Sequence, residues 1–355
     1  MRLSVASCVA LASTLVTASP LIPDERLRIR DSSFTLTSTI YDNAEYYVQY
    51  AASAYCNSED AVGALVTCED GCPTVMANGA TVVGSLPNTT IFNIEGFVAV
   101  DTVREEIVVA FRGSSSLRNW IADLDFIKVS CDYTAGCKVH DGFKVSWDDI
   151  RDACFDLVEE AFDAHPDYTL VVTGHSLGAA VGTLAAVELR NKGYACDLYT
   201  YGSPRVGNLA FVEYVNSQAG AEYRVTHYDD PVPRLPPISL FGYFHTSPEL
   251  WLASGPDTEN DYTISEIDIC LGHYNTSCNA GTVGLDVEAH RHYFQYVGCE
   301  AESDSTASLS AKRSDDGWSL WARDNVSDAE LEQRLYNYTM DDIAYSRELA
   351  VNGTS

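Results

Sequence analysis

The stretch VVTGHSLGAA, residues 171–180, constrains the fold of this chain more than any other segment. It places Ser176 midway between Gly174 and Gly178. The residues before Gly174, YTLVVT, are rich in branched apolar side chains, as in a buried parallel strand. The residues after Gly178, AAVGTLAAVELRNKG, are good helix formers. Glycine on both sides of the serine lets such a strand and helix approach closely around a sharp turn. The stretch therefore predicts a nucleophile elbow with Ser176 exposed at its tip, in preference to an ordinary strand-to-helix turn.

The segments around the elbow alternate between strand and helix patterns. Strand patterns occupy four other segments, which are residues 94–101, 105–113, 197–204 and 222–230. Residues 148–165 and residues 40–56 have helix patterns, the latter amphipathic. Alternation of this kind argues for a mostly parallel sheet with helices on both faces. The chain has 355 residues and is 46% hydrophobic, so it can build a sizeable core, and we expect one α/β domain over residues 31–300.

The N-terminal residues have the pattern of a cleaved secretory signal. Residues 1–18 contain an early Arg2, an apolar stretch from Val5 to Val16 and a small residue at the end. This stretch is too short to span a bilayer, and no other segment approaches about 20 apolar residues. We therefore expect a secreted, extracellular protein in which residues 19–30 form a propeptide or a disordered lead-in.

The composition changes after the predicted domain. Residues 301–355 begin with a linker of small and charged residues that contains the dibasic pair Lys312–Arg313, a candidate processing site. A capping box at Ser327 predicts a helix near residues 328–346. One stripe of this helix consists of Leu331, Leu335 and Tyr338. We favour a solvated or disordered tail over a helix docked on the domain.

The cysteine pattern agrees with an oxidising compartment. Ten of the eleven cysteines remain once Cys8 is assigned to the signal, and all ten can pair. Short spacing predicts three bonds, which are Cys68–Cys72, Cys131–Cys137 and Cys270–Cys278. The remaining cysteines can pair in three ways, and they are Cys56, Cys154, Cys196 and Cys299. No cluster has zinc-type spacing, so we expect no metal.

The surface is expected to be acidic. A formal net charge of −29 argues against binding to nucleic acid, whose phosphates require a basic face, and against steady adsorption to anionic lipid. We therefore expect neutral substrates and a monomer. Five Asn-X-Ser/Thr sequons mark candidate glycan positions, and they are Asn88, Asn275, Asn325, Asn337 and Asn352, of which Asn88 and Asn275 lie within the predicted domain.

A serine on such an elbow needs partners before it can act as a nucleophile. Its hydroxyl needs a neighbouring base, and the base needs a carboxylate that fixes its tautomer and stabilises its charged form. On folds with this elbow, the order along the chain is serine, acid, base. The acid candidates are Asp229 and Asp230, where a strand pattern runs into a proline-rich loop. The base candidates are the later histidines His245, His273, His290 and His292, of which His290 stands out because it lies just before Cys299.

Two further segments complete the predicted site. Charge that develops on a carbonyl oxygen needs backbone N–H donors, and we expect these from Leu177 and from Ser114 in IVVAFRGSSS. The apolar residues that follow this loop fall on one face of a short helix, and they are Leu117, Trp120, Ile121 and Leu124. Beside an oxyanion loop, such a helix can act as a lid that exposes its apolar face at an oil surface.

Together these motifs resemble the secreted class 3 lipases of filamentous fungi. Between residues 40 and 300 the resemblance rests on FRGSSSLRNWIADLDF, HDGF, GHSLGAA, YGSPRVGN, DDPVPRLPP, FGYFHTSPELW and AHRHYF. It implies a single α/β-hydrolase-like domain with a central mixed sheet and no cofactor. It also implies that Ser176 is the nucleophile, Asp230 the orienting carboxylate and His290 the base, whereas His245 lies in a segment not associated with the triad.

The resemblance extends to residues around the triad. It implies that Ser114 and Leu177 are the oxyanion donors and that Trp120 is the lid tryptophan. The long-range disulfide of the family matches Cys56–Cys299. Elimination then leaves Cys154–Cys196, a pair that is not a family feature we recognise.

These expectations describe a secreted, cofactor-free serine ester hydrolase that acts on acylglycerols at an oil–water interface, in the manner of a triacylglycerol lipase. A soluble feruloyl-type esterase is a rival on the same fold, but its counterpart of the lid is polar, unlike the segment around Trp120. Phospholipase A1 or galactolipase activity at the same site stays open as an alternative. A catalytically silent surface glycoprotein is disfavoured because the triad candidates follow one another in the required order.

Overall fold

The computed structural model describes residues 34–68, 71–86, 94–114, 117, 120–121, 124–284, 286–299 and 327–351. The predicted signal over residues 1–18 and the lead-in over residues 19–30 lie outside the described residues. So do Asn88, Asn325, Asn352 and the pair Lys312–Arg313. What was predicted for these segments stays a prediction.

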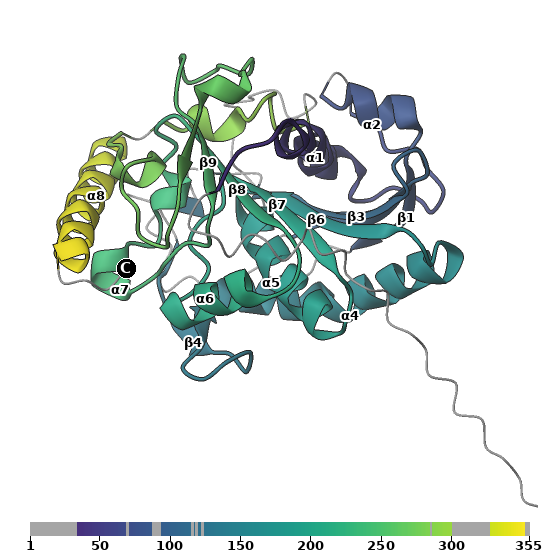
Figure 1. The fold of residues 1–355 in the computed structure, drawn as a ribbon, viewed down its shortest axis with the longest axis horizontal. Coiled ribbons are helices and arrows are strands. Elements are labelled where there is room, and N and C mark those ends of the chain that lie inside the picture. Colours follow the sequence, from purple (N-terminus) through teal and green to yellow (C-terminus); the bar gives the residue numbers. More distant parts are fainter. Residues whose placement is uncertain are drawn as a thin grey trace, which may run out of the picture.

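A mixed eight-stranded sheet lies at the centre of the fold, in the order β1-β2-β3-β6-β7-β8-β9-β10 (Figure 1). Its strands are β1 (Thr81–Leu86), β2 (Gly96–Asp101), β3 (Glu106–Phe111), β6 (Thr169–His175), β7 (Cys196–Tyr201), β8 (Glu222–His227), β9 (Glu249–Leu252) and β10 (Ile267–Cys270). Strands β3, β6, β7, β8 and β9 pair in parallel, whereas β1, β2 and β10 extend the two edges by antiparallel pairing. The prediction of an α/β domain around a central mixed sheet is confirmed.

Helices cover both faces of this sheet because its strands are apolar on both sides. Val98 and Val109 face the core shared with α4 (Asp141–Ala164) and α5 (Leu177–Asn191). Their neighbours along the same strands, such as Val108, face the core under α1 (Ser38–Asn57). Successive residues of a strand point to opposite faces, so a continuous apolar run supplies two cores. Figure 1 shows α1 on one side of the sheet and α4 and α5 on the other.

Shorter elements surround this sandwich. The short helices are α2 (Pro73–Asn78), α6 (Leu209–Ser217) and α7 (Ile238–Phe241), and the 3₁₀ turns are η2 (Val232–Arg234), η3 (Ile264–Glu266), η4 (Asn279–Gly281) and η5 (Ala289–Arg291). A separate two-stranded sheet joins β4 (Lys128–Ser130) and β5 (Lys138–His140). Within the described ranges, no helix combines the length and apolarity needed to cross a bilayer.

The C-terminal helix α8 (Asp328–Val351) is docked on the domain, so the favoured prediction of a solvated tail is wrong. The predicted capping box does form, because Ser327 Oγ accepts a hydrogen bond from Glu330 N at 3.3 Å and the Glu330 carboxylate accepts one from Ser327 N at 2.9 Å. Leu331 and Leu335, on the predicted stripe, are buried against the domain. Figure 1 shows α8 at the left edge of the molecule, close to α7.

A buried ion pair anchors this helix and explains why its docking was not predicted. Asp342 lies 2.8 Å from Arg205, and neither side chain is more than 2% exposed. The same carboxylate accepts hydrogen bonds from the backbone N–H groups of Ile238 and Ser239 at the start of α7. The pair joins residues that are 137 positions apart in the sequence. From the sequence around it, an acidic residue on an otherwise apolar helix stripe is expected to face solvent. Only the tertiary structure shows that Asp342 has a partner.

Four of the five predicted disulfides are present. They are Cys56–Cys299, Cys68–Cys72, Cys131–Cys137 and Cys270–Cys278. The fifth predicted pair is wrong, because Cys154 and Cys196 are free, buried thiols. Cys154 lies in α4 and Cys196 begins β7, while α5 packs against both elements and its Ala186 carbonyl accepts from Cys196 Sγ at 3.7 Å. Burial raises the pKa of both thiols and keeps them protonated.

Candidate active site

Ser176 occupies the sharp turn between β6 and α5. Its φ of 58° and ψ of −127° place a serine in a backbone conformation that residues other than glycine rarely adopt, which is typical of functional sites. A Cβ at Gly174 would lie 2.5 Å from the carbonyl oxygen of Gly178, and one at Gly178 would lie 2.3 Å from the carbonyl oxygen of Phe111 in β3, so both positions need a glycine. The elbow geometry predicted from GHSLG is therefore present.

The elbow serine is less exposed than the sequence predicted. Its relative exposure is only 2%. The loop after β3 lies directly against it, because a Cβ at Gly113 would be 2.7 Å from Ser176 Cβ. The sequence pattern describes the turn itself and carries no information about the segments that fold over it. Ser176 is therefore covered in this structure, not exposed at the tip of the turn.

His290 and Asp230 form a buried pair next to this turn. His290 lies in η5, and its Nδ1 is 2.7 Å from Asp230 Oδ2, in the loop after β8. Asp230 also accepts hydrogen bonds from Val232 N at 2.8 Å and from the hydroxyl of Tyr293. Burial and the adjacent Asp230 raise the pKa of Tyr293 well above its usual range, so the phenol stays a donor. These two donors orient the carboxylate of Asp230, which faces Nδ1 of His290.

The other nitrogen of His290 is open. Among the described residues, Nε2 of His290 is buried and has no hydrogen-bond partner, and no hydrogen bond joins it to Ser176. The two residues are nevertheless brought together by His175, which precedes Ser176 and whose ring centroid lies 4.5 Å from that of His290. A buried nitrogen without a partner is uncommon and marks a position where a proton can be accepted.

The rival candidates lie elsewhere. Asp229 is half-buried beside Gly284, and burial together with the charge of Asp286 raises its pKa. The ring of His292 contacts Asn260 at 3.2 Å, and His273 contacts the carbonyl of His245 at 2.8 Å. Neither Asp229 nor these histidines enters the pair formed by Asp230 and His290.

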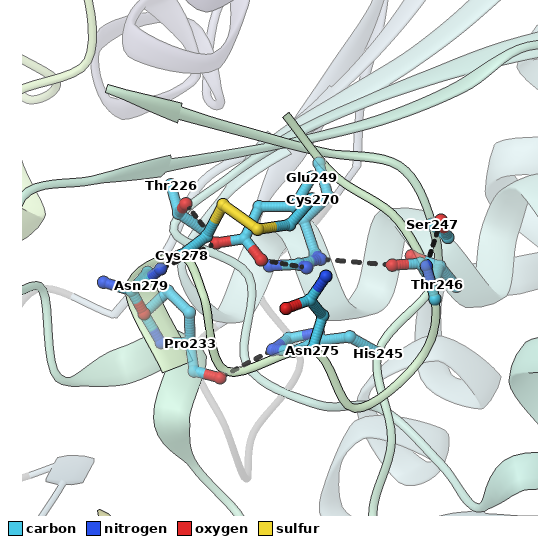
Figure 2. Close-up of polar contacts among 12 residues, drawn as sticks. Thr226, Pro233, His245, Thr246, Ser247, Glu249, Cys270, Asn275, Cys278 and Asn279 are labelled. Carbon is cyan, nitrogen blue, oxygen red and sulfur yellow. Dashed lines mark hydrogen bonds and ion pairs between the residues drawn. A yellow bond between two sulfur atoms is a disulfide. The ribbon is translucent and has the colours of Figure 1, made fainter. Parts of the chain in front are cut away.

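His245, which the resemblance placed in a segment not associated with the triad, belongs to a buried polar cluster next to the Asp230 loop. Figure 2 shows its ring directed at the carbonyl of Pro233, at 2.6 Å. In the same cluster, Glu249 accepts from Thr226 at 2.6 Å and from Asn279 N at 3.3 Å. The Asn279 amide in turn donates to the carbonyl of Asp230 at 3.1 Å. The cluster therefore supports the loop that carries Asp230.

The predicted oxyanion residues flank the elbow. Leu177 is the first residue of α5 and is buried. Ser114 is half-buried and follows Gly113, the residue that lies against Ser176. The amide of Gly113 donates to the hydroxyl of Tyr55 at 2.9 Å, which holds this loop in place. The segments that carry both predicted donors thus adjoin Ser176, Leu177 as the next residue and Ser114 in the loop that lies against it.

The predicted lid residues have their apolar face covered. Leu117 and Ile121 are buried in a cluster with residues from the loop after β8 and from α8, which are Val232, Leu235, Leu331 and Leu335. Trp120 and Leu124 are half-buried, and the Trp120 ring stacks on Phe143 of α4 at a centroid distance of 6.4 Å. Residues between these positions lie outside the described part of the chain. A stripe that is buried in this arrangement agrees with a closed lid.

Sequence reasoning missed three residues that line the site. Tyr293 contacts Asp230, His175 contacts His290, and Tyr55 contacts His175. The first two lie within the motifs AHRHYF and GHSLG, but the motifs alone do not indicate a role for them. Tyr55 had no signal, because it looks like one more tyrosine of an amphipathic helix. Among the described residues, no group of three His, Cys, Asp or Glu side chains is arranged to hold a metal ion.

Known proteins are similar to this chain over most of its length. The family model for class 3 lipases matches residues 108–240. The secreted mono- and diacylglycerol lipase 1 of Fusarium solani is 46% identical over 350 residues, covering 98% of both chains. The secreted mono- and diacylglycerol lipase A of Penicillium cyclopium is 43% identical, over 84% of this chain and 96% of the relative.

Solved structures of similar proteins superimpose on this chain. A mutant form of the Penicillium cyclopium enzyme superimposes with a TM-score of 0.69 at 43% identity, covering 74% of this chain and 98% of that chain. The mono- and diacylglycerol lipase of Aspergillus oryzae superimposes with a TM-score of 0.69 at 40% identity and the same coverage.

Proposed function

This chain belongs to the class 3 lipase family, and from that premise we propose that it hydrolyses acylglycerol esters through an acyl-enzyme formed on Ser176. The observation that carries the proposal is the buried pair of His290 and Asp230, with Nε2 of His290 left open beside the elbow. This is the arrangement that a serine nucleophile requires, since one ring nitrogen is fixed by a carboxylate and the other is free to accept a proton.

In the proposed mechanism, the Ser176 hydroxyl attacks the ester carbonyl while Nε2 of His290 takes its proton. Asp230 keeps the proton of the neutral imidazole on Nδ1 and stabilises the imidazolium that forms. The backbone N–H groups of Ser114 and Leu177 bind the oxyanion. The imidazolium then protonates the leaving glycerol oxygen, and water releases the acyl chain by the same sequence of proton transfers.

The names of the relatives favour partial glycerides as substrates. The Fusarium and Penicillium relatives are mono- and diacylglycerol lipases, and the former matches this chain almost end to end. We therefore propose that mono- and diacylglycerols are cleaved faster than the triacylglycerols that the sequence motifs alone suggested. Residues 1–18 and the secreted relatives together support an extracellular location.

The covered apolar stripe supports action at an interface. Leu117 and Ile121 are buried against the Asp230 loop and α8, and Ser176 is itself only 2% exposed, so we infer that the site is closed in water. Displacement of this segment would expose apolar side chains, which an oil surface can bury again. We propose that the segment containing Trp120 is the lid that opens on contact with lipid.

The test is a hydrolysis series with the wild-type protein and Ser176→Ala. Rates are measured on mono-, di- and triacylglycerols of one acyl chain, with each concentration carried through the solubility limit. The proposal predicts the highest rates on the partial glycerides, a rise in rate when droplets appear, and no activity in Ser176→Ala. Equal activity of Ser176→Ala would contradict the mechanism, whereas faster cleavage of a phospholipid in parallel would change the substrate class.

A further inference from the structure

A chain of three hydrogen bonds links the loop after β3 to the turn that carries His290. The amide of Gly113 lies 2.9 Å from the hydroxyl of Tyr55. The same hydroxyl lies 2.7 Å from Nδ1 of His175, and Nε2 of His175 lies 2.7 Å from the backbone carbonyl of His290. The chain thus passes beside Ser176 and joins both of its flanks.

The direction of each bond follows from the groups involved. The His290 carbonyl can only accept, so Nε2 of His175 must carry the proton. Burial and the neighbouring His290 hold the pKa of His175 well below its ordinary value, so the ring is neutral and Nδ1 is an acceptor. The Tyr55 hydroxyl therefore donates to His175 and accepts from Gly113 N–H. One tautomer of His175 satisfies every bond in the chain.

A disulfide also ties the Tyr55 position of this hydrogen-bond chain to its His290 side. Tyr55 lies in the last turn of α1, and the next residue, Cys56, is bonded to Cys299 in the segment that follows the His290 turn. Space around the hydroxyl is tight, because a Cβ at Gly113 would lie 2.5 Å from it. The hydroxyl of Tyr55 is therefore held at one position relative to both flanks of the site.

We propose that Tyr55 and His175 are positioning residues that fix the oxyanion loop relative to the base, by holding the Gly113 amide and the His290 carbonyl through one shared hydrogen-bond chain. This inference rests on the proposed function, because the hydrogen-bond chain is given a role in the reaction proposed above. We assign neither residue a step of the reaction itself. Both act through the residues they hold, namely Gly113 beside the Ser114 donor and the turn that carries His290.

A role in positioning differs from a purely structural role in what each removal changes. Loss of a structural hydrogen bond lowers stability and leaves the turnover of the folded enzyme unchanged. Loss of a positioning bond misplaces the oxyanion donor and the base, so kcat falls while KM changes little. Because the two residues act in one chain, removing the second after the first should add little further loss.

The variants that test this are Tyr55→Phe, His175→Leu and the two combined, assayed on the soluble ester p-nitrophenyl butyrate. The control is Tyr47→Phe on the same helix, whose buried hydroxyl donates to Glu106 at 2.7 Å, away from the site. His175→Gln is a partial rescue, because its amide keeps an N–H donor for the His290 carbonyl. Thermal midpoints are measured for all variants, so that stability and turnover are separated.

We expect Tyr55→Phe to lower kcat about ten-fold, equivalent to about 1.4 kcal/mol, with KM changed less than about two-fold. The Tyr47→Phe control should keep its kcat even if its thermal midpoint falls as far. The combined variant should be no slower than His175→Leu, and His175→Gln should be faster than His175→Leu. A Tyr55→Phe enzyme with wild-type kcat and a lowered midpoint would overturn the proposal.

A second measurement decides the hydrogen-bond chain without any substrate. The ¹⁵N chemical shifts of the His175 ring should report a neutral Nε2–H tautomer in the wild type and a changed Nδ1 signal in Tyr55→Phe. An Nδ1–H tautomer in the wild type would overturn the chain. If the wild-type protein instead shows the expected ring signals but cleaves no ester, the proposed function fails and the hydrogen-bond chain does not.

Discussion

The two flanks of the candidate site are held by different forces. On the flank of His290, polar groups are joined in a hydrogen-bonded set that runs from Asp230 to Tyr55 and is closed by Cys56–Cys299. On the flank of the lid, Leu117 and Ile121 pack against apolar residues of the Asp230 loop and of α8. Hydrogen bonds fix distances and directions, whereas apolar contacts can be exchanged for another apolar surface. The comparison suggests that one flank is preorganised for proton transfer and that the other is built to move.

The largest predicted effect comes from removing His290, the proposed base on the polar flank. His290→Ala should lower kcat/KM by about 10⁵- to 10⁶-fold, because no other group can take the proton of Ser176. The matched variant His292→Ala removes a histidine two positions away that contacts Asn260 and Glu288. It should change kcat/KM by less than about three-fold. A His292 variant that is the inactive one would show that the base is wrongly assigned.

The next largest effect comes from removing the ion pair between Asp342 and Arg205, which anchors α8 on the lid flank. Asp342→Asn leaves Arg205 buried without its counter-ion, which should cost about 3–5 kcal/mol of docking stability. Hydrogen exchange should show that the α8 amides lose protection while those of the central sheet keep theirs. The control is Asp341→Asn, at the exposed neighbouring position, which should leave the protection unchanged. Unaltered α8 protection in Asp342→Asn would mean that apolar contacts alone hold the helix.

A smaller effect concerns pH and the polar cluster that supports the Asp230 loop. Burial, together with the charges of Arg224 and Arg205, holds the pKa of His245 well below its ordinary value of about 6.5. Below that value the unfolded chain binds a proton that the native state does not, so the free energy of unfolding falls as the pH falls. The slope is at most about 1.4 kcal/mol per pH unit for each such group.

Chemical denaturation between pH 4.5 and 8 measures this dependence. The wild type should lose stability as the pH drops below about 6.5, and His245→Gln should show a shallower loss. His175 contributes with the same sign, because burial and the charge of His290 also lower its pKa. An identical slope in His245→Gln would show that His245 is protonated in the native state.

Most of the fold and the polar centre of the site were predictable because their signals are local. The glycines around Ser176 are required because Gly174 lies against the backbone of Gly178 in α5, while Gly178 lies against the backbone at the end of β3. The branched runs of β2 and β3 reflect burial on both faces. The choice of Asp230 and His290 came from chain order and family motifs. The structure pairs these two residues and leaves Asp229 and His292 apart.

The features that the sequence did not predict share a physical cause, because each depends on a contact between distant segments. Asp342 looks like a solvated residue until Arg205 is placed beside it. Cys154 and Cys196 were paired by elimination, but α5 packs against both of their elements and neither thiol has a sulfur partner. Tyr55 gains its meaning only from Gly113 and His175, which lie 58 and 120 positions away.

The most direct test of the proposed mechanism is active-site labelling with a fluorophosphonate that carries an alkyl chain, read by intact mass and peptide mapping. The account predicts one phosphonyl group per chain, located on Ser176, with labelling abolished in Ser176→Ala and slowed in His290→Ala. Labelling at another residue, or labelling that persists in Ser176→Ala, would contradict the assignment of Ser176 as the nucleophile.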